Sequence, residues 1–108
     1  MTEATFEDWQ KIQLRVGEIL HVEDHPQADK LYILTVDLGD EKRTIVAGIK
    51  AHYAQKELIG KQIVVIANLA PKTLRGINSQ GMTLAANDGE HVVLLQPDKH
   101  IKNGAVIS

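Results

Sequence analysis

The sequence predicts a mainly β protein: a small barrel of five or six short strands, with one helix between the third and fourth strands and a helical turn near the N-terminus. Three observations lead to this prediction. Apolar and polar residues alternate over several short segments, which is the period-two pattern of half-buried strands. Glycines lie in or beside several of these segments, and a glycine within a strand marks the bends that close a barrel. Only two segments have helical character.

The first half of the chain predicts a helical turn and three strands. Residues 5–11 begin like a helix, because Thr5 is followed three residues later by Asp8, the spacing of a capping box. A strand follows from Leu14 and ends at the His25-Pro26 pair, since proline cannot donate to a strand ladder. Two further strands and the turn between them, at residues 31–38, 44–47 and 39–41, form a predicted hairpin.

The second half predicts a short helix that ends at Gly60, and after it a buried strand, a loop, two more strands and a tail. In chain order these segments are residues 52–58, 63–67, 68–76, 82–86, 92–95 and 97–108. A five-stranded Greek-key barrel with a helix after its third strand is the arrangement of an OB-fold, whose sheet face and loops bind oligonucleotides. The strand count equally allows an SH3-like barrel or a small sandwich. A chain of 108 residues supports one core, so residues 1–108 are expected to form one domain.

Composition excludes several functional classes. A net charge of −2 excludes a uniformly cationic protein that binds polyanions through bulk charge. The absence of cysteine excludes a disulfide scaffold, a thiolate zinc site and a cysteine nucleophile. The longest apolar runs are far shorter than the roughly 18 residues needed to cross a bilayer, and the polar N-terminus is not a targeting signal. We expect a cytoplasmic protein with no membrane partner.

The average charge hides a segregation along the chain. Residues 1–41 carry three cations and ten acids, whereas residues 42–75 carry seven cations and one acid. The middle third could therefore form a local cationic patch on a mildly acidic protein. Folding could equally interleave the two signs, because a sequence segment is not a surface.

No group of residues predicts catalysis. Neither serine lies in a Gly-x-Ser-x-Gly elbow, and the glycines are too widely spaced for a phosphate-binding loop. His21, Glu23 and His25 alternate at a strand end and could bind zinc in an enzyme. Polar residues entering a proline turn are more often simply solvated, so we expect no catalytic residue, no metal and no cofactor.

The loop at residues 68–82 is the candidate binding segment. Aromatic residues make up only 4% of the chain, which disfavours single-strand binding by stacking, although Tyr32 could serve as a platform. A protein that reads folded RNA through phosphates and riboses needs Lys, Arg, Asn and Ser instead, and this loop supplies them. Its Lys72 and Arg75 have no acid within ten residues on either side. A solvated loop is the alternative for any one of these residues.

Residues 14–86 closely resemble the tRNA-binding domain that occurs as a stand-alone dimeric protein and as a domain appended to methionyl-tRNA synthetases. Related copies occur in the cytokine precursor of the animal multisynthetase complex. The matching segments are LRVGEI (14–19), HPQADKLY (25–32), VDLG (36–39), RTIVAGI (43–49), ELIGK (57–61), ANLAP (67–71), LRGI (74–77) and SQGM (79–82).

The resemblance implies an OB-fold that binds tRNA by shape, without strong dependence on the anticodon, and that has no catalytic activity of its own. It implies as partners tRNA, a second copy of the chain and possibly an aminoacyl-tRNA synthetase. The implied tRNA-binding residues are Lys30, Arg43, Asn68, Lys72, Arg75, Ser79 and Met82. The implied dimer contacts are Phe6, Trp9, Val106 and Ile107, within extensions at residues 1–13 and 91–108.

The chain is expected to be either a stand-alone protein or the C-terminal domain of a methionyl-tRNA synthetase. A module of the same fold that binds proteins or acts as a chaperone, without RNA as its main ligand, is the alternative.

Overall fold

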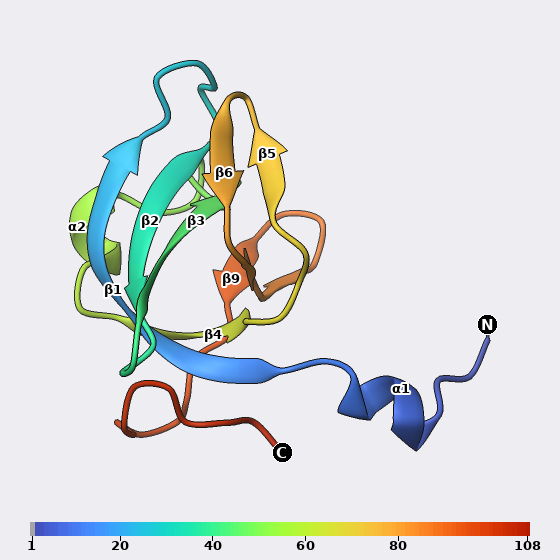
Figure 1. The fold of residues 1–108 in the computed structure, drawn as a ribbon. Helices are drawn as coiled ribbons and strands as arrows, with labels where there is room; N and C mark the ends of the chain where they lie inside the picture. Colours follow the sequence, from blue (N-terminus) through green and yellow to red (C-terminus); the bar gives the residue numbers. More distant parts are fainter. Residues whose placement is uncertain (1) are drawn as a thin grey trace.

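The computed structural model describes residues 2–108 as an antiparallel barrel with two added hairpins (Figure 1). Two short helices and nine strands follow one another within residues 2–108. Their bounds are α1 Phe6–Gln10, β1 Leu14–Asp24, β2 Tyr32–Asp37, β3 Lys42–Ala47, α2 Gln55–Leu58, β4 Gln62–Ile66, β5 Lys72–Leu74, β6 Ile77–Ser79, β7 Met82–Thr83, β8 Ala85–Asn87 and β9 Val92–Leu94.

Five strands form the barrel in the order β3-β2-β1-β4-β7, and every neighbouring pair is antiparallel. The open edge of β3 is closed by the segment that precedes β7. The Gln80 amide donates to the Thr44 carbonyl at 2.8 Å, and the Thr44 amide donates to Gln80 Oε1 at 3.0 Å. The helix α2 lies between β3 and β4, so the predicted five-stranded barrel with its helix after strand three is confirmed.

The core lies inside the barrel and is aliphatic. Most of its fully buried members come from β1 to β4 and α2, and they include Ile19, Leu34, Ile45, Leu58 and Ile63. The strand β1 is long and bends around this core, with a bulge between Ile19 and His21. At Gly17 a Cβ atom would lie 2.4 Å from the side chain of Val36, so only glycine lets β2 pack this closely against β1.

The predicted N-terminal helical turn is present, and its cap is the predicted one. The Asp8 amide donates to Thr5 Oγ1 at 3.1 Å, while the Thr5 amide donates to Asp8 Oδ2 at 3.0 Å. No residue of α1 is buried, and the helix stands away from the barrel (Figure 1). Its packing surface within one chain is therefore small.

Residues 68–76 are not a loop throughout, because β5 and β6 form a hairpin joined by Arg75 and Gly76. The backbone φ angles of these two residues are +52° and +86°, as a type I′ turn requires. Residues 82–86 also differ from the prediction and divide into β7 and β8. Between these strands Leu84 bonds through its amide to Val64 and through its carbonyl to Leu95, which bends the chain from one pairing to the next.

Of the two roles open to Tyr32, the structure excludes that of an exposed stacking platform. Its ring is buried in the core, and its hydroxyl donates to the Tyr53 carbonyl at 2.7 Å. An inward-facing tyrosine on β2 uses its one polar atom on the backbone of the segment that precedes α2.

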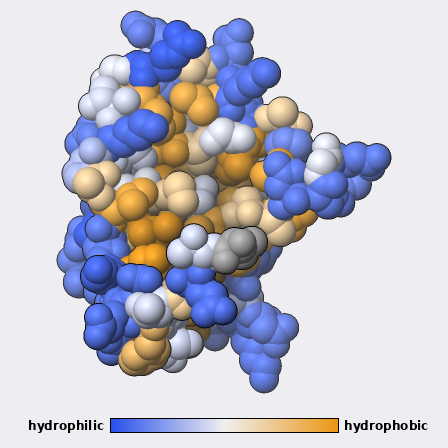
Figure 2. Space-filling model, turned by 90° about the vertical axis from the view of Figure 1, so that its right-hand side faces the viewer, coloured by the Kyte–Doolittle hydropathy of each residue, from blue (hydrophilic) through white to orange (hydrophobic). Residues whose placement is uncertain are grey.

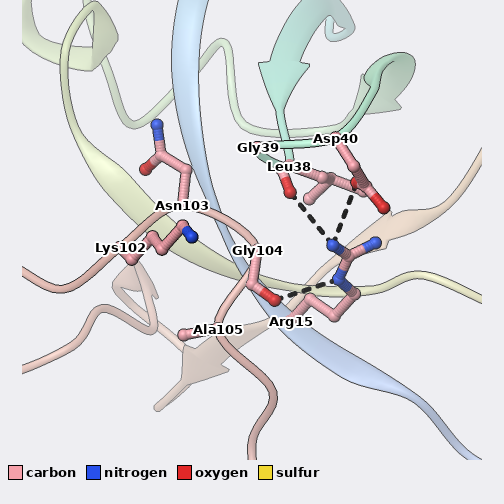
Figure 3. Close-up of a pocket in the computed structure, with 8 residues that line it drawn as sticks. All are labelled: Arg15, Leu38, Gly39, Asp40, Lys102, Asn103, Gly104 and Ala105. Carbon is pink, nitrogen blue, oxygen red and sulfur yellow. Dashed lines mark hydrogen bonds and ion pairs between the residues drawn. The ribbon is translucent and has the colours of Figure 1, made fainter.

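The C-terminal segment is fastened to the barrel by Arg15 (Figure 3). The guanidinium donates to the carbonyls of Gly104 and Leu38 at 3.1 and 3.0 Å and pairs with Asp40 at 3.1 Å. Gly104 has a φ of +92°, and a Cβ there would lie 2.2 Å from the Leu38 carbonyl oxygen. The predicted extension at residues 91–108 is therefore partly built into the fold, since β9 also pairs with β8.

Among residues 2–108, no helix is long and apolar enough to span a bilayer.

Candidate nucleic-acid interface

The β5–β6 hairpin projects from the barrel and carries two of the predicted cations. Its strands pair with each other and belong to a sheet of their own (Figure 1). Lys72 opens β5, and Arg75 occupies the first turn position. Both side chains are exposed, and neither forms an ion pair with any residue that the structure describes.

Arg75 lies in an unfavourable backbone conformation. Within residues 2–108 it is the only non-glycine residue with a positive φ. The first position of a type I′ turn favours asparagine, aspartate or glycine, because a larger side chain is strained there. Such strain costs on the order of 1–3 kcal/mol and is concentrated at functional sites. The turn thus holds a guanidinium at the hairpin tip at a cost to stability.

Lys30 lies at the same end of the barrel as this tip. It belongs to the loop between β1 and β2, which reaches the hairpin through a hydrogen bond from His25 Nε2 to the Leu74 carbonyl at 2.9 Å (Figure 1). Lys30 is exposed and, within the described part of the chain, has no acidic partner. The fold therefore brings the loop that carries Lys30 against the hairpin that carries Arg75, although 45 positions separate the two residues in the sequence.

Arg43 is placed differently from the other cations. Its guanidinium is half-buried, pairs with Glu41 at 2.7 Å, and donates to the carbonyls of Ala67 and Gln80. The hydrogen bond from Arg43 lowers the pKa of the Glu41 carboxyl below its usual value. Arg43 thus joins β3 to the end of β4 and the start of β7, and little of its charge faces solvent.

Two other predicted contacts are also engaged within the chain. Ser79 is only 4% exposed; its Oγ accepts from the Val46 amide at 2.9 Å and donates to the Gly81 carbonyl at 3.0 Å. Asn68 is exposed, but its amide group bonds to the backbone of Lys11 and Gln13 at 2.6 and 2.7 Å. These side chains position the hairpin base and the N-terminal segment.

Met82, the remaining predicted site residue, is exposed on β7 next to Ile66. The structure therefore places Lys72 and Arg75 on one hairpin and Lys30 on the β1–β2 loop, which is hydrogen-bonded to that hairpin. Arg43, Asn68 and Met82 lie around the ends of β4 and β7.

The cations of residues 42–75 do not form one patch. Arg43 and Lys50 pair with Glu41 and Asp24, two acids of the first third of the chain. Lys56 lies on α2, on the opposite side of the barrel from the hairpin (Figure 1). Folding thus pairs some cations of the middle third with acids of the first third. Lys72 and Arg75 on the hairpin form no ion pair with any described residue.

The zinc interpretation is not supported by the geometry. His21 and Glu23 pair at 3.6 Å, but His25 turns inward and uses both ring nitrogens on the backbone. Among residues 2–108 no three potential ligands form a metal-binding group.

Exposed hydrophobic side chains lie on α1 and on the C-terminal segment. Figure 2 shows hydrophobic residues gathered in the middle of one face, with hydrophilic residues around them, on the side where Figure 1 places α1. Phe6 and Val106 are 71% and 65% exposed, and Trp9 is also exposed, whereas Ile107 is half-buried. Val106 bridges to Arg15 and Ile107 donates to Leu14, so the C-terminal segment runs along the start of β1.

Residues 14–106 match the family described as "Putative tRNA binding domain". The chain belongs to this family of tRNA-binding domains. The chain is 61% identical over 102 residues to the methionine–tRNA ligase of Pyrococcus abyssi, and 54% identical over 99 residues to that of Methanocaldococcus jannaschii. These matches cover 94% and 91% of the chain but only 14% and 15% of the ligases. The tRNA-binding domain is thus a small, non-catalytic part of these enzymes.

Two solved structures resemble this tRNA-binding domain over its whole length. A MetRS-related protein from Pyrococcus horikoshii superposes with a TM-score of 0.93 at 34% identity and covers 100% of both chains. The chaperone CsaA from Bacillus anthracis superposes with a TM-score of 0.90 at 35% identity and covers 99% of this chain and 100% of its own. The family resemblance predicted from the sequence is confirmed.

Sequence reasoning missed two residues that shape the interface. His25 was considered only as a candidate zinc ligand and as the strand end before Pro26, and Gln80, which closes the barrel on Thr44, was given no role. The available signal was a histidine directly before a proline turn, but its partner Leu74 lies 49 positions away.

Proposed function

We propose that this domain binds tRNA in a structure-specific manner through the β5–β6 hairpin and the neighbouring β1–β2 loop. The observation that carries the proposal is the conformation of Arg75, an exposed guanidinium held at positive φ at the hairpin tip. Lys72, on the same hairpin, and Lys30, on the neighbouring β1–β2 loop, add two exposed cations that form no ion pair within the described part of the chain.

The chemistry of this surface suits phosphates and riboses rather than stacked bases. Tyr32 is buried and Tyr53 half-buried, so neither tyrosine offers a free ring to a nucleobase. Exposed Lys and Arg side chains bind phosphates without reading sequence, so recognition follows the shape of the folded RNA. Binding of this kind weakens steeply as salt rises, because each phosphate contact releases counterions.

A second copy of the chain is the partner proposed for the hydrophobic face. Phe6, Trp9 and Val106 expose apolar surface near both chain ends, and the described part of the chain buries no residue of α1. A homodimer formed there would cover this surface and carry two tRNA-binding hairpins. Two linked hairpins would bind one tRNA more tightly than either does alone.

The wider context of the domain is also a proposal. The chain spans 14–15% of the length of the methionine–tRNA ligases given above. In such an enzyme, or as a separate cytoplasmic protein acting beside a synthetase, the domain would hold the tRNA body while aminoacylation takes place elsewhere.

Lys72→Glu tests the proposed surface. We expect weaker binding of total tRNA and a log–log salt slope reduced by about 1, because one phosphate contact is lost. The matched control is Lys56→Glu, the same charge reversal on α2. Equal losses in both variants would mean that only net charge matters, and would contradict the proposed site.

A chaperone-like module is the second candidate, favoured by the likeness to CsaA and by the exposed apolar face. It predicts binding of an extended apolar peptide that tRNA does not displace and that Lys72→Glu leaves unchanged. A peptide titration run beside the tRNA titration separates the two functions.

A further inference from the structure

His25 is buried and fully hydrogen-bonded. It is 5% exposed, and Ser79 is the only other buried polar residue within residues 2–108. Its Nδ1 lies 3.0 Å from the Gln27 amide, and its Nε2 lies 2.9 Å from the Leu74 carbonyl. An amide N–H only donates and a carbonyl only accepts, so the ring is neutral and carries its proton on Nε2.

The bond from Nε2 joins the hairpin tip to the barrel. The hairpin base is held on β3 by Ser79 and Gln80. Towards the tip, no other hydrogen bond of the described chain ties residues 73–77 to anything beyond the hairpin itself. Leu74 directly precedes Arg75, so the bond fixes the residue next to the strained cation.

The same histidine closes the loop that carries Lys30. The His25 amide donates to the Leu31 carbonyl at 3.1 Å, and the Leu31 amide donates to Ala28 at 3.2 Å. The Gln27 bond to Nδ1 completes this turn after Pro26. One imidazole therefore shapes the β1–β2 loop with one nitrogen and holds the hairpin with the other.

We propose that His25 is a positioning residue that sets the spacing of Lys30 and Arg75 and thereby the affinity for tRNA. This role rests on the proposed tRNA-binding function. Two cations held at a fixed spacing bind two phosphates at a smaller entropic cost than two cations on independently moving segments. His25 itself is buried and does not touch the RNA.

Two substitutions of His25 each keep one of the two hydrogen bonds that its imidazole forms. In His25→Asn, Oδ1 takes the place of Nδ1 and accepts from the Gln27 amide as an Asx-turn, but the side chain is too short to reach Leu74. In His25→Gln, the amide nitrogen extends to the position of Nε2 and keeps a donor for the Leu74 carbonyl. The pair therefore tests the link to the hairpin separately from the turn.

The experiment is a titration of total tRNA against the wild-type chain and both variants, with thermal unfolding of each. We expect His25→Asn to bind about fivefold more weakly, which corresponds to the loss of one neutral hydrogen bond, and His25→Gln to bind nearly as the wild type. Arg75→Asn should cost less affinity in the His25→Asn background than in the wild type, because the cation is already misplaced there.

Other results would refute either the positioning role of His25 or the proposed tRNA-binding function. Equal affinities of all three chains, or equal losses in both variants, would refute the positioning role while leaving the proposed function intact. Failure of the wild-type chain to bind tRNA would refute the proposed function itself. Should the variants not fold, the ring nitrogen shifts of wild-type His25 by NMR decide: protonation at Nε2 supports the link, and protonation at Nδ1 refutes it.

Discussion

Arg75 has a strained backbone conformation, and this conformation places its guanidinium at the tip of the hairpin. In a type I′ turn its φ of +52° suits asparagine far better than arginine. Arg75→Asn therefore removes the guanidinium and improves the turn at the same time. We predict unchanged or higher stability in urea, by up to about 1 kcal/mol, together with weaker binding of tRNA.

The control for this prediction is Arg75→Lys, which keeps a cation in the same strained position. It should retain most of the affinity and none of the gain in stability. Loss of stability in Arg75→Asn would show that the side chain supports the fold, contrary to our interpretation.

Asp40 pairs with Arg15 at the end of the barrel opposite the hairpin tip, and this pair makes the stability of the fold depend on pH. The hydrogen bond from Arg15 lowers the pKa of Asp40 below the ordinary value of 3.8. A depressed folded-state pKa adds stability above the unfolded value, and this contribution is lost as the pH falls through the folded value. We predict that Asp40→Asn lowers the Tm at neutral pH and flattens its decline below pH 3.8. Parallel Tm curves for the two chains would contradict this role.

At the residue scale, local features could be predicted and distant ones could not. The Thr5–Asp8 capping box depends on residues three apart, and the structure confirms it. Ser79 and Arg43 were expected to face a ligand, but their partners lie 33 and 24 positions away. A serine or arginine in a polar stretch gives no indication that its hydrogen bonds are already used.

At the scale of elements, the β5–β6 hairpin is the feature that positions the interface. Ser79→Ala leaves the Val46 amide without its acceptor inside the barrel, so we predict a loss of about 1–3 kcal/mol in the free energy of unfolding. Thr73→Ala, on the exposed face of the same hairpin, should cost much less. Urea unfolding measures both, and equal small losses would show that the hairpin base is not anchored through Ser79.

The barrel strands could be predicted, because burial of one face imposes a clear period of two on β2 and an apolar run on β4. The hairpin was missed because its strands have three residues each and its turn is Arg-Gly rather than the usual Asn-Gly. The break between β7 and β8 was missed because Leu84 bonds to Val64 and Leu95, which lie 20 and 11 positions away, rather than within a local turn.

At the scale of the whole molecule, the C-terminal segment runs along the start of β1, and both this segment and α1 expose apolar side chains. We predict that Trp9→Asp lowers the solution mass from a dimer to a monomer, because a charge cannot be buried unpaired in an apolar interface. Binding of tRNA should weaken in consequence, through loss of the second hairpin. Light scattering measures the mass, and an unchanged mass would remove α1 from the proposed interface.

The distribution of charge over the surface of the folded molecule could be predicted only in part. The segregation along the sequence is real, but folding pairs Arg43 and Lys50 with acids and moves Lys56 to the far side of the barrel. Lys30, from the acidic third, joins the hairpin cations instead. Which cations remain free depends on the topology, which a count along the chain does not contain.

The central claim is that a few free cations around one hairpin bind tRNA. The most direct measurement is a filter-binding titration of total tRNA, at two salt concentrations, with the wild-type chain and with the Lys72→Glu, Arg75→Asn double variant. The account predicts salt-sensitive binding by the wild type, and weaker binding with a shallower salt slope for the double variant. Identical affinities and slopes for the two chains would contradict it.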